Sequence, residues 1–203
     1  MIPALVLAAG KSSRMGRTKA LLPAGPSGET FINRVIRVLR EGGADAVIAV
    51  IGGDAATVRA SLPRDEASLA VVENPRFEDG QLSSLQVGLA AVEQRFDDIE
   101  AAMVTLVDLP LISPSTVRAV LEAFRSNPQA PLVRPRRAGR YGHPVIFNRS
   151  IFGELRRADP AKGAKPIVHA HADGELNVDV DDPGAFADID TPEDYDRIIR
   201  PQV

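Results

Sequence analysis

One stretch near the start of the chain reads Leu7-Ala8-Ala9-Gly10-Lys11-Ser12-Ser13-Arg14-Met15-Gly16-Arg17-Thr18-Lys19-Ala20-Leu21-Leu22-Pro23. It continues from a short apolar run, Ala4–Ala9, which predicts a buried β-strand. The glycines and serines let backbone N–H groups approach an anion closely, and Arg14 and Lys19 add positive charge beside them. A strand followed by such a loop predicts a cradle for a triphosphate. For this loop alone, a tight connection with solvated basic residues is the alternative.

Two common phosphate-binding motifs are excluded. Gly10-Lys11-Ser12 resembles the end of a Walker A loop, but that motif needs a glycine five residues earlier, where Leu5 stands. No Gly-x-Gly-x-x-Gly sequence follows a predicted strand either, so the fingerprint of a classical dinucleotide fold is absent. The loop is therefore neither a Walker A loop nor a classical dinucleotide fingerprint.

Short apolar runs alternate with segments of helical spacing along the first 125 residues. The predicted strands are Ala4–Ala9, Ala46–Ile51, Leu69–Val72 and Ala101–Val107. The predicted helices are Phe31–Arg40, Ala55–Leu62, Leu82–Phe96 and Ser115–Arg125. This alternation is typical of an α/β fold with parallel strands and helices on both faces of the sheet. The length of 203 residues suits a single domain, residues 1–203.

The pattern changes after Asn127, where several prolines and a basic run interrupt it. An antiparallel excursion over the active face is expected in this C-terminal half. We expect a strand at Tyr141–Phe147, a helix at Ser150–Arg157 and a strand at Leu176–Val180. A last helix begins after Thr191, which is placed to cap it, with Pro192 at its first position.

Composition excludes several classes of protein. There are no cysteines, so disulfides and thiolate ligands are excluded and any metal must be held by oxygen or histidine. The net charge of -3 argues against a nucleic-acid platform. No signal-peptide pattern is present, and no stretch approaches the roughly 20 apolar residues of a membrane span. We therefore expect a cytoplasmic enzyme with no nucleic-acid or membrane partner.

Three aspartates are candidate ligands for a metal ion. Asp108 closes the predicted strand Ala101–Val107, and ligands of open parallel sheets bind beyond the carboxyl ends of strands. A carboxylate beside a triphosphate is repulsive unless a divalent cation such as Mg²⁺ lies between them. Asp188 and Asp190, just before the last helix, could supply a second carboxylate. The structural alternatives are a turn cap at Asp108 and helix capping at the other two.

Two further segments are candidate substrate contacts. Gly80, Ser83 and Ser84 precede or begin a predicted helix, where the serines could bond a base or ribose or cap the helix. His143, in Gly-His-Pro, could bond an acceptor phosphate or be only a polar residue at a strand start. Lys165 lies at the start of another predicted helix, where it would suit an anionic acceptor.

These motifs, in this order, resemble the molybdenum cofactor nucleotidyltransferases. The resemblance rests on Leu7–Pro23, Asn74–Leu89, Val107–Pro110, Gly142–Pro144 and Asp188–Asp194. It implies a three-layer, Rossmann-like fold of the glycosyltransferase-A type that the NTP transferase superfamily shares. Within the family, Leu-Ala-Ala-Gly resembles the cytidylyltransferases, whereas guanylyltransferases have Leu-Ala-Gly-Gly, so Ala9 favours CTP. Leu85 departs from the further serine expected there.

The resemblance implies transfer of CMP from CTP to molybdopterin that bears molybdenum, with release of pyrophosphate. An acceptor phosphate oxygen would attack the α-phosphorus in line, without a protein nucleophile. Arg14 and the loop amides would hold the β- and γ-phosphates, and Lys19 the α-phosphate. Mg²⁺ would bind to Asp108 with Asp188 or Asp190. The residues implied to bind the nucleotide are Leu7, Ala8, Ala9, Gly10, Ser12, Ser13, Arg14, Lys19, Gly80, Ser83, Ser84 and Asp108; Arg14, Lys19 and Asp108 are the implied catalytic residues.

Two alternatives remain open. The same phosphate chemistry suits a nucleotidyltransferase that acts on a sugar phosphate or another phosphorylated acceptor, or one that uses GTP. A protein that binds the nucleotide or cofactor without turnover is a different class. Besides CTP and molybdopterin, the resemblance implies a molybdoenzyme or its chaperone as a protein partner.

Overall fold

The computed structural model describes residues 1–63 and 69–199 of the chain. Its strands form one sheet in the order β3-β2-β1-β4-β7-β5-β6, with β8 also paired to β5. The strands are β1 (Ala4–Ala8), β2 (Val47–Ile51), β3 (Leu69–Glu73), β4 (Ala101–Leu106), β5 (Leu132–Arg137), β6 (Arg140–Tyr141), β7 (Val145–Asn148) and β8 (Leu176–Asp179). The helices are α1 (Phe31–Glu41), α2 (Ala55–Ser61), α3 (Gln81–Arg95), α4 (Pro114–Ser126), α5 (Phe152–Arg157), α6 (Lys165–Ala170) and α7 (Pro192–Ile198).

The N-terminal half of the sheet is parallel, as predicted. β1 lies between β2 and β4, and β2 pairs with β3. All five residues of β1 and of β2 are buried, which explains why these strands read as continuous apolar runs. Because the strands run in one direction, the loops after β1 and β4 emerge at the same edge of the sheet.

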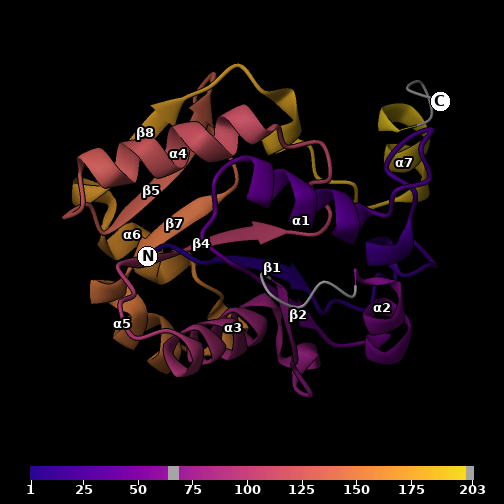
Figure 1. Cartoon of the computed structure of the whole chain (residues 1–203), viewed down its shortest axis with the longest axis horizontal. Helices are drawn as coiled ribbons and strands as arrows, with labels where there is room; N and C mark the ends of the chain where they lie inside the picture. Colours follow the sequence, from indigo (N-terminus) through magenta and orange to yellow (C-terminus); the bar gives the residue numbers. More distant parts are fainter. Residues whose placement is uncertain (64–68, 200–203) are drawn as a thin grey trace.

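Helices cover both faces of the sheet (Figure 1), so the predicted α/β class is confirmed. On one face, Ala4 and Val6 of β1 share a core with Phe31 of α1 and Phe124 of α4. On the other face, the alternate β1 residues share a second core with α3 and α5. Side chains that alternate along a strand point to opposite faces, so each buried strand contributes to both cores.

The C-terminal half carries the predicted antiparallel excursion. β7 pairs antiparallel with β4, and β5 pairs antiparallel with β7 and then with β6. The prediction of one strand over Tyr141–Phe147 was wrong: residues 142–144 separate β6 from β7. A side chain at Gly142 would meet the carbonyl oxygen of Ala185 at 2.3 Å, so the 3-10 turn η6 (Pro183–Phe186) packs against the chain here and interrupts the strand.

The helix ends agree closely with their sequence signals. Thr191 caps α7 through a capping box with Asp194, and Pro192 is its first residue. α4 begins at Pro114 and is capped by the Ser113 side chain. The predicted helix Ser150–Arg157 is a 3-10 turn, Arg149–Ile151, that continues into α5. No helix in the described ranges is long and apolar enough to cross a membrane.

Candidate functional site

A cavity of about 320 Å³ lies where the loops after β1 and β4 emerge from the sheet. Its walls come from the loop that follows β1, from the start of α3 and from Asp108 after β4. All the residues predicted to bind the nucleotide line it, except Ser83. Residues as far apart in the sequence as Leu7, Asp108 and Asp190 therefore converge on one cavity.

Ser12 sets the shape of the loop after β1. It has a positive φ of 53°, and its carbonyl oxygen accepts hydrogen bonds from the N–H groups of Met15 and Gly16 at 3.0 and 3.1 Å. Its hydroxyl accepts from the backbone N–H of Lys19 at 3.0 Å. Within the described part of the chain, the backbone N–H groups of residues 10–14 have no acceptor. These donors are left for an anion in the cavity.

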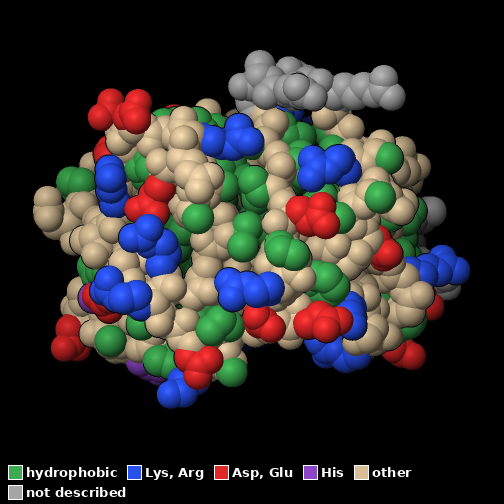
Figure 2. All heavy atoms as spheres, turned by 90° about the horizontal axis from the view of Figure 1, so that it is seen from below, with side chains coloured by type: hydrophobic (Ala, Val, Ile, Leu, Met, Phe, Trp, Pro, Cys, Tyr) green, Lys and Arg blue, Asp and Glu red, His purple; other side chains and the backbone are tan. Residues whose placement is uncertain are grey.

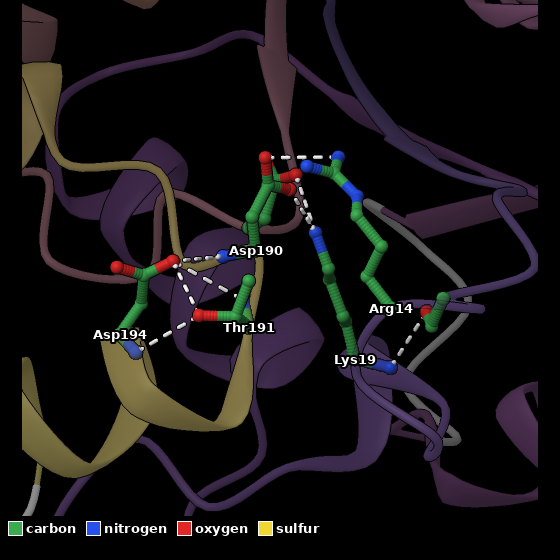
Figure 3. A network of polar contacts seen from close by, with 7 residues as sticks. Arg14, Lys19, Asp190, Thr191 and Asp194 are labelled. Atoms are coloured by element: carbon green, nitrogen blue, oxygen red, sulfur yellow. Dashed lines mark hydrogen bonds and ion pairs between the residues drawn. The ribbon is translucent and has the colours of Figure 1, made fainter.

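Lys19 and Arg14 make ion pairs with the aspartates of the site (Figure 3). The Lys19 ammonium lies 3.1 Å from Oδ2 of Asp108 and 2.5 Å from Oδ1 of Asp190. The Arg14 guanidinium lies 2.9 Å from the other oxygen of Asp190. The hydrogen bond from Lys19 is the main reason that the pKa of Asp190 lies below its ordinary value. The cations of the loop therefore neutralise the acids of the site.

The remaining acidic groups fit a divalent cation. Oδ1 of Asp108 is buried and has no hydrogen-bond partner among the described residues. The pKa of Asp188 is raised, first by burial and then by the negative charges of Asp108 and Asp190. Over residues 1–63 and 69–199, no ready-made group of three or more acidic or histidine side chains surrounds a metal position. One or two carboxylates are enough for Mg²⁺ when phosphates and water complete its shell.

Helix capping does not account for Asp190. The capping box of α7 consists of Thr191 and Asp194, and the Asp190 carboxylate points instead toward Lys19 and Arg14 (Figure 3). The backbone N–H of Ile189 donates to the carbonyl oxygen of Asp108 at 2.9 Å. That bond ties the loop before α7 to the loop after β4, which brings the three aspartates together.

A second cavity of about 340 Å³ adjoins the first. Both cavities are lined by Arg14, Gln81, Leu106, Asp108 and Asp190. The second is also lined by Gly142, His143 and Asp188, which belong to recognised motifs, and by residues that were not predicted: Arg140, Tyr141, Ala185 and Phe186. The aspartates and Arg14 thus lie between two adjoining binding spaces.

His143 is electrically neutral at ordinary pH. Burial, helped by the positive charge of Arg134, lowers the pKa of its imidazole to about 4. A neutral imidazole has one N–H donor and one acceptor nitrogen, so it can bond a phosphate without adding charge. The predicted role of His143 as a contact to an acceptor phosphate stays consistent with its position.

Two predicted site residues are not brought to the cavities. Ser83 is 1% exposed, and its hydroxyl bonds the carbonyl oxygens of Arg76 and Gly80 and the Asn74 amide. It therefore closes the turn before α3, while the neighbouring Ser84 lines the first cavity. Lys165 is exposed at the start of α6 and lines neither cavity.

Several lining residues lie within or beside the recognised motifs but were not predicted as site residues. Phe77 and Gln81 lie on either side of Gly80 and line the first cavity, and Gln81 also lines the second. Arg140 and Tyr141 directly precede Gly142-His143-Pro144. Their position directly before that motif was the one feature of the sequence that could have indicated them as site residues. What could not be inferred was that the hairpin of β5 and β6 turns them toward the aspartates.

The surface seen from below Figure 1 carries no segregated charge. Figure 2 shows basic and acidic side chains interspersed on this face. Charge is concentrated instead around the two cavities, where Arg14, Lys19, Arg140 and three aspartates meet.

The sequence matches the family described as MobA-like NTP transferase domain over residues 4–175. Rv0371c from Mycobacterium tuberculosis H37Rv has a similar structure, with 35% identity, a TM-score of 0.78 and 98% of each chain covered. Another crystal structure of that protein, a complex with manganese, matches with 33% identity, a TM-score of 0.73 and the same coverage.

Curated relatives match over different extents. The molybdenum cofactor cytidylyltransferase of Escherichia coli (strain K12) is 25% identical over 197 residues, which are 96% of this chain and 93% of the relative. The bifunctional protein GlmU of Staphylococcus saprophyticus is 28% identical over 61% of this chain. That alignment covers only 26% of the length of GlmU.

Proposed function

Because the chain belongs to the MobA-like NTP transferase domain family, we propose that it transfers CMP from CTP to molybdenum-bearing molybdopterin and releases pyrophosphate. The observation that carries this proposal is the pair of adjoining cavities that share Arg14, Asp108 and Asp190. A nucleotidyl transfer needs a donor and an acceptor on opposite sides of one phosphorus atom. The near full-length match to the E. coli cytidylyltransferase supports this choice of substrates.

The first cavity suits the nucleotide. The free N–H groups of residues 10–14 and the Arg14 guanidinium would hold the β- and γ-phosphates, and Lys19 the α-phosphate. Ala9, whose place in Leu-Ala-Ala-Gly resembles the cytidylyltransferases and so favours cytosine over guanine, lines this cavity. The Cβ of Ala9 lies against Gly52, where an added side chain would meet it at 2.8 Å.

The second cavity suits the phosphorylated acceptor. Arg140 lies in this cavity with neutral His143; its guanidinium donates to the Phe186 carbonyl oxygen at 3.3 Å, and its charge acts on Asp188. Together they would bind the acceptor phosphate and direct one of its oxygens at the α-phosphorus. As that P–O bond forms, the bond to pyrophosphate breaks on the opposite side, where Arg14 and the loop amides take up the charge of the leaving group.

Asp108 and Asp188 are the residues proposed to hold Mg²⁺. The unpartnered Oδ1 of Asp108 and the raised pKa of Asp188 both indicate negative charge that a cation would stabilise. A bound ion would supply charge neutralisation for the phosphates. Asp190 would become available to it once phosphates attract Lys19 and Arg14 away. We place the reaction in the cytoplasm, where nucleoside triphosphates are supplied.

Replacing Asp108 with asparagine tests the proposal. Asp108→Asn keeps the shape of the side chain but removes the charge, so kcat for pyrophosphate release should fall at least about 100-fold. The thermal unfolding temperature should stay near that of the wild type. Asp179→Asn is the matched control, because Asp179 is an exposed partner of Arg136 and lies outside both cavities, and its activity should be unchanged.

The wild-type protein should be assayed with each nucleoside triphosphate and with candidate acceptors. Pyrophosphate release with CTP and molybdenum-bearing molybdopterin is the expected result. Product with GTP alone would change the assigned base, and product only with a sugar phosphate would reject molybdopterin as acceptor. Nucleotide binding without turnover under every condition would favour the non-catalytic alternative.

A further inference from the structure

Tyr141 is the one large hydrophobic side chain that is exposed in the described part of the chain, with 51% of its surface accessible. It lies at the end of β6 and lines the second cavity. Large apolar side chains are normally buried, and an exposed ring in the wall of a cavity needs an explanation. Folding alone supplies none, because Tyr141 belongs to neither hydrophobic core.

One face of the Tyr141 ring is already covered. The guanidinium carbon of Arg134, on β5, lies 3.7 Å from the ring centroid, which is a close cation–π contact. This contact lies on one face of the ring, and the residue as a whole remains 51% exposed. Tyr141 therefore presents a free aromatic face beside the cavity.

Arg134 is itself held firmly. Its Nε and Nη2 atoms donate to the two carboxylate oxygens of Glu175 at 2.7 and 2.8 Å. The Glu175 side chain is only 4% exposed, so this two-pronged pair is shielded from water. Arg134 acts through Tyr141 as a positioning residue: it fixes the plane of the ring before any ligand arrives.

The rest of the second cavity fits a ring that carries a phosphate. Phe186 adds another aromatic wall, and Gly142, between Tyr141 and His143, leaves it room: a side chain at Gly142 would meet the Phe186 ring at 2.8 Å. Arg140 and His143 are the groups available to an anion in the same cavity. An aromatic surface and a phosphate site thus lie side by side.

We propose that Tyr141 determines acceptor specificity by stacking on a flat heteroaromatic ring system, with the acceptor phosphate directed toward Arg140 and His143. This inference rests on the proposed function, in which the acceptor is a pterin that carries a phosphate. Stacking of this kind recognises the shape and the π-face of the ring, so it selects against acceptors without a flat ring, such as sugar phosphates.

The test measures binding of a fluorescent pterin monophosphate and of ringless glycerol phosphate to the wild type and to two variants. Tyr141→Leu should weaken binding of the pterin about 5- to 150-fold, the range for loss of one stacked ring. It should leave the affinity for glycerol phosphate within about twofold of the wild type. Tyr141→Phe, which keeps the ring, should bind the pterin like the wild type.

Several results would overturn this role of Tyr141. The role is rejected if the wild type does not bind the pterin, or if Tyr141→Leu binds it as tightly as the wild type. It is also rejected if Tyr141→Leu loses affinity for the pterin and for glycerol phosphate to the same extent. The affinity for CTP, measured on the same samples, reports whether each variant is folded. If pterin binding depends on the ring at position 141 but molybdopterin gives no pyrophosphate with CTP, the stacking role stands and only the proposed function fails.

Discussion

Lys19 lies where two carboxylates share one ammonium. Its ammonium bonds Asp108 and Asp190, and the residue is 9% exposed. A triphosphate in the first cavity would offer it stronger anionic partners and would release both carboxylates. Arg14, which is much more exposed, pairs with Asp190 from the solvent side. The same two cations can therefore serve the empty and the loaded site.

At His143, the low pKa predicts a pH-dependent contribution to stability. The unfolded chain takes up a proton near the ordinary value of 6.5, whereas the folded chain does so only near 4. Between these values the unfolded state binds more protons, so stability falls as pH falls, and above 6.5 the residue contributes nothing to the slope. His143→Gln should reduce the loss of unfolding free energy between pH 7.5 and 4.5 by about 1–3 kcal/mol.

Urea unfolding at the two pH values measures that difference. His169→Gln is the matched control, because His169 is exposed on α6, and it should behave like the wild type. Equal pH dependence in the wild type and in His143→Gln would show that the ring is not held neutral by the fold.

Single residues were predictable where local chemistry decides their role. The Gly10–Lys19 loop is found from its composition, because an unpaired backbone and two cations suit an anion wherever the loop sits. Ser83 was misassigned because its neighbour Asn74 lies nine residues away and takes its hydroxyl inward. Tyr141 and Arg140 were missed because they form a cavity only together with Asp188 and Phe186. Those two residues lie more than 40 positions later in the sequence.

Among the elements, the 3-10 turn η6 (Pro183–Phe186) positions one wall of the second cavity. Asp182 anchors it: its carboxylate accepts from the Ser113 N–H, from the Ser113 and Thr116 hydroxyls and from the Gly184 N–H, all within 3.0 Å. This network joins η6 to the start of α4. A shift of η6 would therefore move Ala185 and Phe186 relative to Tyr141.

Gly184 is the most sensitive position in η6. A Cβ there would lie 1.9 Å from the carbonyl oxygen of Leu111, a backbone atom that cannot swing aside. Gly184→Ala should cost about 2–4 kcal/mol of unfolding free energy and raise the KM for the acceptor, with a smaller effect on the KM for CTP. Gly153→Ala in α5 meets only the flexible Arg157 side chain and should be neutral or stabilising. Equal changes in both KM values would contradict a local role for η6.

The elements of the first half were predictable because their apolar runs are continuous and their helices amphipathic. β5 was not predicted, because its basic residues and Pro135 suggest a loop. Pro135 lacks the N–H that a central strand uses, but it lies where the partner of β5 changes from β7 to β6. Its carbonyl oxygen still accepts from the Gly142 N–H at 3.0 Å. Only the pairing of distant strands reveals that this position tolerates a proline.

At the scale of the whole molecule, the two halves of the sheet supply different parts of the site. The parallel half presents the loop of residues 10–19 and Asp108, and the antiparallel half presents Arg140, Tyr141 and His143. The loop before α7 brings Asp188 and Asp190 to the line where the halves meet. The free energy of unfolding and the affinity for ligands therefore both depend on the charged side chains between the two halves.

That linkage predicts an exchange between the Lys19 ammonium and a metal ion. In Lys19→Met, Asp108 and Asp190 lose their shared cation, so the metal-free variant should be about 2–4 kcal/mol less stable than the wild type. Divalent cations without nucleotide should raise its unfolding temperature more than that of the wild type, because Lys19 no longer competes for the carboxylates. Thermal unfolding with increasing Mg²⁺ or Mn²⁺ measures both effects, and Lys162→Met, at an exposed position outside both cavities, is the control. If metal raised the unfolding temperatures of Lys19→Met and the wild type equally, the ammonium and the metal ion would not share these carboxylates.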